Sequence, residues 1–239
     1  IFVSIISFLK KIPFAIIAMD LYPEALIGHF RNNYFFNIVK SPLEKIFNIS
    51  YKSAKGIVCL GNRMKLEIIK KGVDPNKIQI INNWATGNIK KTTSNIYRKK
   101  WKIKAKKVIL YSGNLGLAHD YITILKAIKK SKLTANDLQL IFVAAGKNIC
   151  KAKLYAEKEL NDNIIIFKEL VDRKEFSKTL AIADLALVSI RDGFDGLVYP
   201  SKFQGYICRS LPILYIGPKS DISEIIEKYN IGIWFKNYK

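Results

Sequence analysis

Short apolar runs recur along this chain, and polar or amphipathic stretches separate them. Strands that are apolar along their whole length belong to parallel sheets that helices cover on both faces. The pattern therefore predicts an α/β fold. The predicted strands are residues 14–19, 56–60, 77–81, 107–111, 138–144, 163–167, 184–190, 212–217 and 231–235.

Residues that cap helices predict several helix boundaries. Ser41, Pro42 and Glu44 have the spacing of a capping box with proline at the first helical position, so we expect a helix to begin there. Asn62 is placed to cap the next amphipathic stretch, and Gly72 is placed to end it.

The alternation fails between the third and fourth apolar runs, where the chain is polar, cationic and weakly periodic. We expect a first domain over residues 1–85, a basic linker over 86–106 and a second domain over 107–239. Residues 98–107 carry seven cations in ten positions. Such a cluster suits either a solvated linker or an anionic membrane surface.

The charge of the chain comes almost entirely from lysine. The formal net charge of the 239 residues is +21, and all but six of the 40 basic residues are lysine. Specific base and phosphate recognition favours arginine, so this bias argues against a sequence-specific DNA-binding protein. The alternative is that the lysine excess reflects an AT-rich genome and says nothing about function.

The cysteines and the first residues bear on location. Cys59, Cys150 and Cys208 lie far apart, which predicts neither a disulfide framework nor a zinc site and agrees with a reducing, cytoplasmic compartment. The apolar opening over residues 1–9 is followed by Lys10 and is too short to span a bilayer. We expect the sequence to be a fragment of a longer protein.

Residues that directly follow the strands are candidates for ligand binding, because open α/β sheets bind ligands beyond the carboxyl ends of their strands. After residues 107–111, Gly113 and Gly116 allow a close turn before a helix that opens near Asp120. This loop is either a plain tight turn or a phosphate cradle at a helix N-terminus. Gly146 either closes a turn or admits a planar ring.

The segment after residues 184–190 predicts a second anion site. Pro200 and Ser201 have the pattern of a helix start, which would place amide groups, the Ser201 hydroxyl and Lys202 at the positive end of a helix. Such a site favours a diphosphate, and the alternative is an ordinary capped helix with a solvated lysine. A charged donor in a dry cleft is worth about 2.7–4 kcal/mol in a transition state, against about 0.3–1 kcal/mol for the helix dipole, so we expect Lys202 to matter more.

Two acidic residues and two histidines complete the candidates. Asp20 and Glu24 follow the first apolar run, where one could act as a base or Asp20 could cap a helix. His29 is expected to pack inside a short apolar helix, whereas for His119, in the glycine loop, a ligand contact and a structural role are both open. The chain has none of the motifs of zinc enzymes, P-loop proteins or Ser-His-Asp hydrolases.

A series of segments then carries a family resemblance. From Ala18 to Ile233 the chain resembles bacterial retaining glycosyltransferases of family 4, most of all the branch of cell-surface polysaccharide synthesis that includes O-antigen. The resemblance implies the GT-B architecture: two Rossmann-like parallel-sheet domains that face a cleft, here with an incomplete N-terminal domain and an incomplete C-terminal end. The segments are MDLYPE, IVCLGNRM, INNWA, LYSGNLGLAHDYITIL, ADLALVSI, GLVYPSKFQGYICRSLPILYIGP and SEIIEKYNIG.

The resemblance also implies chemistry. It implies transfer of a sugar, most often from a UDP-sugar, to a lipid-linked or saccharide acceptor, with retention and with neither a metal nor a cofactor. Lys202 would be catalytic, and Asp20 and Glu24 would face the acceptor. The implied partners are the nucleotide sugar, the acceptor and the inner face of the cytoplasmic membrane as a peripheral contact, with no nucleic acid. The implied donor-binding residues are Gly113, Asn114, Gly116, His119, Gly146, Ser201, Lys202 and Gly205.

The chain departs from the family pattern at several positions. Leu197 and Gly205 stand where many members have two glutamates eight positions apart, so neither can bind a sugar hydroxyl by a carboxylate. His119 and Asp120 stand where an Arg-Lys pair is often found, and Ser210 replaces a glycine in the turn before the next strand.

Three other hypotheses stay open at this point. A sugar-nucleotide epimerase shares the architecture, but its chemistry needs carboxylates and histidines in which this chain is poor. A basic nucleic-acid-binding protein would bind with a steep salt dependence, but the chain has no aromatic-basic stacking motif. A truncated gene product without activity is the third.

Overall fold

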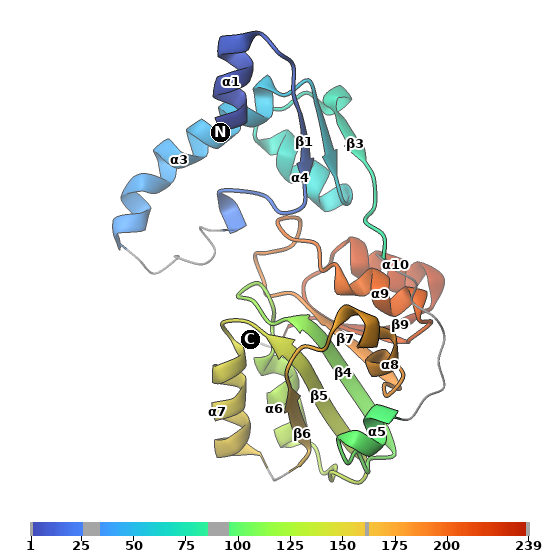
Figure 1. Cartoon of the computed structure of the whole chain (residues 1–239). Helices are drawn as coiled ribbons and strands as arrows, with labels where there is room; N and C mark the ends of the chain where they lie inside the picture. Colours follow the sequence, from blue (N-terminus) through green and yellow to red (C-terminus); the bar gives the residue numbers. More distant parts are fainter. Residues whose placement is uncertain (1, 26–33, 86–95, 161–162, 238–239) are drawn as a thin grey trace. The chain divides into compact units, whose positions relative to one another are not determined.

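The computed structural model describes residues 2–25, 34–85, 96–160 and 163–237 (Figure 1). All nine predicted strands are present in these ranges, and every strand pair within the two sheets is parallel. The predicted α/β class is confirmed. The chain forms two compact units: a first unit of residues 1–83 and 192–199, and a second unit of residues 84–191 and 200–239.

The second unit is built on a six-stranded sheet with the order β6-β5-β4-β7-β8-β9. The chain order therefore reverses between β4 and β7, which pair through Ile109 with Leu185 and Leu110 with Ala186. This order corresponds to that of a Rossmann sheet, in which ligands bind at the carboxyl ends of the strands beside the reversal. The strands are β4 (Lys107–Asn114), β5 (Leu138–Ala145), β6 (Ile165–Lys168), β7 (Leu185–Ser189), β8 (Ile213–Ile216) and β9 (Gly232–Phe235).

Helices pack on this sheet and complete its core. Helices α6 and α7 contact each other, as do α5 and α8, and α9 contacts β7 (Figure 1). Aromatic rings fill much of the core, where Phe142 is tilted against Tyr111 at 5.5 Å and stacks on Phe167 at 5.2 Å between ring centroids. The helices are α5 (Ile96–Lys100), α6 (Ile122–Lys130), α7 (Ile149–Glu159), η2 (Arg173–Glu175), α8 (Phe176–Leu180), α9 (Lys202–Cys208) and α10 (Asp221–Tyr229).

The first unit has a smaller parallel sheet with the order β1-β2-β3. Its core includes Leu21, Ile57, Met64 and Ile68, all almost completely buried. The elements are α1 (Phe2–Lys10), β1 (Ala15–Ala18), α3 (Tyr34–Ser53), β2 (Gly56–Cys59), α4 (Asn62–Lys70), η1 (Pro75–Lys77) and β3 (Ile78–Ile80).

The segment 192–199 belongs to the first unit, although the predicted second domain included it. The Leu21 amide donates to the Leu197 carbonyl at 2.8 Å, and Asp20 forms an isolated antiparallel bridge with Val198. These contacts join the loop after β1 to residues that are far away in sequence. Leu197, at a position where the family pattern has a glutamate, packs against the core of this unit.

Two predicted helix starts are wrong. The capping-box residues Ser41, Pro42 and Glu44 lie inside α3, which begins at Tyr34. Asn62 is the first residue of α4, whose N-cap is Gly61. Capping residues also occur within helices, so the local pattern alone did not locate either start. The predicted stop is correct: Gly72 follows the end of α4 with φ +82°, a backbone conformation that favours glycine.

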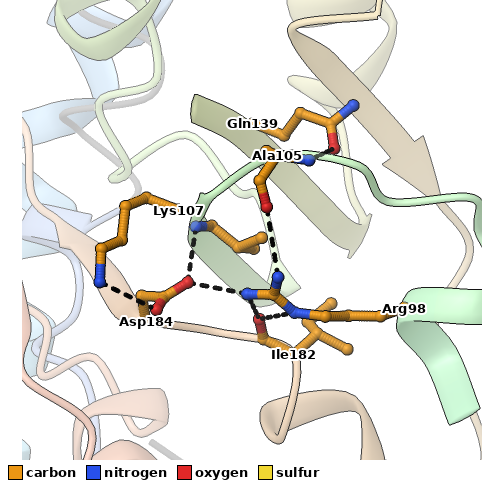
Figure 2. Close-up of polar contacts among 7 residues, drawn as sticks. Arg98, Ala105, Lys107, Gln139, Ile182 and Asp184 are labelled. Atoms are coloured by element: carbon orange, nitrogen blue, oxygen red, sulfur yellow. Dashed lines mark hydrogen bonds and ion pairs between the residues drawn. The ribbon is translucent and has the colours of Figure 1, made fainter. Parts of the chain in front are cut away.

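The part of the predicted basic linker that the structure describes is packed on the second unit. Arg98 of α5 donates to the Asp184 carboxylate at 2.8 Å and to the carbonyls of Ile182 and Ala105 at 2.9 and 3.3 Å (Figure 2). Tyr97 of the same segment is buried. Residues 96–106 are therefore a docked segment rather than a solvated linker, while 86–95 lie outside the described residues.

No helix in the described ranges combines the length and the apolar character needed to cross a membrane.

Candidate functional site

The candidate site lies in the second unit, beyond the carboxyl ends of β4 and β7. Its central group is the amine of Lys202, the first residue of α9. The Lys202 Nζ donates to the Tyr111 hydroxyl at 2.7 Å and lies 3.4 Å from Nε2 of His119. It also lies 4.2 Å from the centroid of the Tyr111 ring. The three residues come from β4, from the loop after it and from α9, so the fold brings together positions about 90 residues apart.

Both neighbours of the amine act as hydrogen-bond acceptors. The Tyr111 hydroxyl donates its proton to the Asn114 carbonyl at 2.7 Å, which leaves its lone pairs for Lys202. An ammonium group has three N–H donors, and only these two neighbours take up its donors among the described residues. One donor is thus left for a ligand.

Burial sets the protonation of the site. Desolvation lowers the pKa of Lys202 to about 7, because the amine has no carboxylate partner within the described part of the chain. Desolvation and then the charge of Lys202 lower the pKa of His119 to about 3, so this imidazole is neutral at pH 7. Burial raises the pKa of Tyr111 and of Tyr206, so both phenols keep their protons.

Glycine shapes the end of β4 and the turn after β5. Gly113 has φ +119°, and a Cβ atom there would lie 3.5 Å from Cε of Lys202. Gly146, after β5, has φ +117°, and a Cβ atom there would lie 2.2 Å from Oδ1 of Asn114 and 2.9 Å from the Leu115 carbonyl oxygen. Glycine at 146 therefore leaves room for Asn114 and Leu115 at the end of β4, which accounts for this residue without the planar ring of the prediction.

The predicted phosphate cradle at the start of α6 is largely occupied by the protein. Asp120 accepts from the Thr123 amide at 3.1 Å and from the Thr123 hydroxyl at 2.6 Å. Its Oδ2 also accepts from the side chain of Asn237 at 2.8 Å. The backbone at Gly116 is also held by a hydrogen bond, because its carbonyl oxygen accepts from the side-chain amide of Asn148 at 3.0 Å. The helix does open near Asp120, but this carboxylate caps it in place of an external anion.

Helix α9 is attached to the sheet on the side of the candidate site. Ser201 is its N-cap and makes no side-chain capping hydrogen bond. Gly205 and Tyr206 are buried, and the Tyr206 hydroxyl accepts from the Ser112 amide of β4 at 2.7 Å. This bond holds α9 against β4, the strand that contains Tyr111. It therefore positions the first residue of the helix, Lys202, beside Tyr111.

The predicted acceptor-side residues lie in the first unit. Glu24 forms an ion pair with Lys71, whose side chain is only 6% exposed. Asp20 lies two residues after the end of β1. Partial desolvation raises the pKa of its carboxyl group. Glu24 is therefore engaged within its own unit, and Asp20 is the less constrained of the two. His29 lies outside the described residues.

Sequence reasoning missed Tyr111 and Ser189. Tyr111 stands within an apolar run that predicts a core strand, and its ring is in the core while its hydroxyl reaches the loop. Ser189 ends β7, and its carbonyl oxygen lies 2.8 Å from Nδ1 of His119. Both residues carry polar atoms near the carboxyl ends of the two strands beside the chain reversal, and this is the signal that could have identified them.

The described residues contain no group of three or more His, Cys, Asp or Glu side chains placed to hold a metal ion together.

A family model described as "Glycosyl transferases group 1" matches residues 93–239. Over 223 residues the chain is 29% identical to a protein of Pseudomonas aeruginosa described as "Probable glycosyltransferase WbjE", covering 89% of this chain and 53% of that protein. The chain therefore spans about half the length of this curated relative.

Solved structures with the same fold match nearly the whole chain. WaaG, a glycosyltransferase involved in lipopolysaccharide biosynthesis, matches with a TM-score of 0.73 at 18% identity over 98% of this chain and 68% of its own. Anabaena HepE, in complex with UDP and glucose, matches with a TM-score of 0.78 at 14% identity over 98% of this chain and 60% of its own. The predicted GT-B fold class is confirmed by these matches.

Proposed function

Because the chain belongs to the group 1 glycosyl transferases, we propose that the whole protein transfers a sugar from a nucleoside-diphosphate donor to a hydroxyl group of its acceptor. The observation that carries this proposal is the amine of Lys202, which is surrounded by neutral groups at the ligand-binding edge of the sheet. A partly buried, desolvated amine without a counter-ion is a site for an anion, and a diphosphate carries the required charge.

The proposed step uses this charge on the leaving group. The bond between the anomeric carbon and the diphosphate oxygen breaks, the acceptor oxygen bonds to the carbon, and the hydroxyl proton passes to the departing diphosphate. Negative charge grows on the diphosphate as the bond breaks, so a fixed cation stabilises the transition state more than the bound donor. We propose that Lys202 supplies that charge, without a metal, and that the anomeric configuration is retained.

We propose a UDP-sugar as the donor. Support comes from the likeness in fold to HepE, whose structures hold UDP with glucose in one case and UDP-glucose in another. Gly113, near the end of β4, lies beside the side chain of Lys202, and we propose that Gly113 and Asn114 contact the donor. Gly146, Ser201 and Gly205 belong to the same proposed donor site, and Asp20 to the acceptor side.

We further propose a lipid-linked or saccharide acceptor in cell-surface polysaccharide synthesis, used at the inner face of the cytoplasmic membrane. Five exposed lysines of the docked basic segment, and a sixth at the start of β4, would attract anionic lipid. They are Lys99, Lys100, Lys102, Lys104, Lys106 and Lys107. Sedimentation with phosphatidylglycerol vesicles tests this contact, with phosphatidylcholine vesicles as the control, and equal recovery with both would refute it.

Nucleotide release tests the central proposal. The full-length protein is incubated with a panel of UDP-, GDP- and ADP-sugars, with and without a membrane extract that supplies acceptors. We expect release of UDP that depends on the extract. Conversion of a UDP-sugar without acceptor would instead identify an epimerase, and no donor-dependent release with any member of the panel would refute the transfer.

A further inference from the structure

His119 makes two polar contacts, one through each ring nitrogen. Its Nδ1 lies 2.8 Å from the carbonyl oxygen of Ser189, at the end of β7. A carbonyl oxygen only accepts, so Nδ1 carries the proton of the neutral ring. Nε2 then has a free lone pair, and this atom lies 3.4 Å from Nζ of Lys202. Both contacts require the same tautomer.

From this arrangement we infer that His119 is a positioning residue for Lys202, which directs the amine through the Nε2 lone pair and does not itself contact the substrate. The inference rests on the proposed function, in which Lys202 contacts the donor diphosphate. It assigns His119 a role different from the direct donor contact that the family resemblance implies.

Two neighbours, Tyr111 and His119, together fix the orientation of the Lys202 amine. Tyr111 accepts one N–H of Lys202 and is itself held by its bond to the Asn114 carbonyl. The Tyr111 ring also meets the His119 ring edge to face, with centroids 6.0 Å apart. Two fixed acceptors leave one direction for the third N–H. Without His119, the amine could rotate about the remaining bond to Tyr111.

The neutral state of His119 suits this role. Burial and the charge of Lys202 lower its pKa to about 3, so the ring stays neutral at physiological pH and does not repel the ammonium. The other titratable groups around Lys202 are Tyr111 and, behind it, Tyr206, and burial raises the pKa of both. A neutral acceptor that bonds to the ammonium favours the charged form of Lys202.

The tautomer can be measured without any substrate. Long-range proton–nitrogen NMR spectra of the labelled full-length protein are assigned at His119 by comparison with His119→Gln. We expect the His119 ring to be neutral and protonated at Nδ1 from pH 8 down to about pH 5. A ring protonated at Nε2, or on both nitrogens at pH 7, would overturn the inference whether or not the protein transfers sugar.

Kinetics test the effect on Lys202. His119→Leu removes the acceptor, and His119→Gln keeps one in the side-chain amide. With UDP-glucose, UDP-galactose and UDP-N-acetylglucosamine as probes, we expect kcat of His119→Leu to fall about tenfold with little change in KM. The reason is that the Lys202 amine is no longer held in one orientation toward the diphosphate. The alkaline limb of its pH profile should move down by roughly half a pH unit, since the ammonium loses an acceptor. His119→Gln should recover most of kcat and the wild-type profile.

The outcomes separate this inference from the proposed function. Wild-type turnover and pH profile in His119→Leu, together with an inactive Lys202→Ala, would overturn the positioning role and leave the transfer in place. A loss of kcat with an unshifted profile, and a fall in melting temperature shared by the glutamine variant, would show a purely structural histidine and would also overturn it. If the wild-type protein releases no nucleotide at all, the proposed function fails, and the NMR spectra still decide the tautomer.

Discussion

Lys71 of the first unit is buried and Lys202 of the second unit is partly buried, and their surroundings are opposite. Lys71 of the first unit pairs with the carboxylate of Glu24 and lies 5.4 Å from the centroid of the Tyr51 ring. Lys202 of the second unit meets a phenol and a neutral imidazole. Buried charges in proteins are ordinarily paired, so the first lysine is typical and the second is not.

The difference separates a lysine that serves the fold from one that serves a ligand. The charge of Lys71 is compensated within its own unit, and an incoming anion would have to compete with Glu24. The charge of Lys202 is uncompensated in the described structure, and this is why desolvation lowers its pKa to about 7. Its full charge returns when an anion binds, so the protein holds a cation that is stabilised by its ligand.

The largest effect on stability is expected at Lys71. Lys71→Met leaves the Glu24 carboxylate, whose side chain is 27% exposed, without its cation, and should lower the free energy of unfolding by about 3 kcal/mol. Urea denaturation of the full-length protein measures this. Lys70→Met is the matched control, because Lys70 is 70% exposed beside Glu67 and its loss should cost well under 1 kcal/mol.

A double variant sharpens this result. Adding Glu24→Gln to Lys71→Met removes the stranded charge and should recover part of the lost stability. A loss below 1 kcal/mol in Lys71→Met, or no recovery in the double variant, would mean that the pair does not stabilise the first unit.

Lys202→Ala should behave in the opposite way. We expect turnover to fall on the order of a hundredfold, about 2.7 kcal/mol of transition-state stabilisation, with little loss of stability because no carboxylate is stranded. UDP release by the full-length protein measures the first effect, and urea denaturation the second. Lys126→Ala, at an exposed position of α6, is the control for removing one lysine from the same unit. Wild-type turnover in Lys202→Ala would remove this residue from the mechanism.

The elements of both units were predictable because the strands are continuously apolar, and such a pattern depends on nearby residues alone. Apart from the two helix starts, the errors came from interactions between distant residues. Arg98 lies in a lysine-rich stretch that suggests a linker, and only its bond to Asp184, 86 positions away, shows that the stretch is docked. Glu24 offers no local sign that Lys71 will neutralise it, 47 positions later.

The candidate site was predictable in part for the same reason. The glycine residues at the end of the fourth predicted strand and the segment that contains Lys202 follow apolar runs, and open α/β sheets bind ligands beyond the carboxyl ends of their strands. The hydrogen-bond partners of the Lys202 amine were not predictable. They are Tyr111, 91 positions away, and His119, 83 positions away. Asp120 also occupies a helix start that the sequence left open to an anion.

The protein should take up protons when it binds the donor, because the charge of Lys202 has no counter-ion until the diphosphate arrives. The pKa of about 7 in the free protein rises when the diphosphate binds, so the bound state holds more protons above pH 7. Affinity for UDP-glucose should then fall about tenfold between pH 6 and pH 8, with uptake of about half a proton at pH 7. Titration calorimetry in two buffers of different ionisation enthalpy measures the uptake.

Variants assign this proton. Lys202→Met should abolish the uptake, whereas Lys70→Met should leave it unchanged. Binding of UDP-glucose that does not vary between pH 6 and pH 8, or uptake that persists in Lys202→Met, would show that the diphosphate does not meet a titrating Lys202.

The smallest effect is expected at Ser210, just beyond the helix that carries Lys202. Ser210 has φ +58°, where the family pattern has a glycine, and this conformation costs a residue with a side chain about 1 kcal/mol. Ser210→Gly removes that cost but gives the unfolded chain more freedom, so stability should rise by only about 0.5 kcal/mol. Asn230→Gly is the control, because Asn230 has φ +49° at the end of α10 and asparagine tolerates that conformation. Its gain should be smaller. No contact with Lys202 is seen for either residue in the described structure, so turnover should stay at the wild-type value in both variants. A change of turnover in Ser210→Gly would mean that the end of α9 affects the orientation of the Lys202 amine.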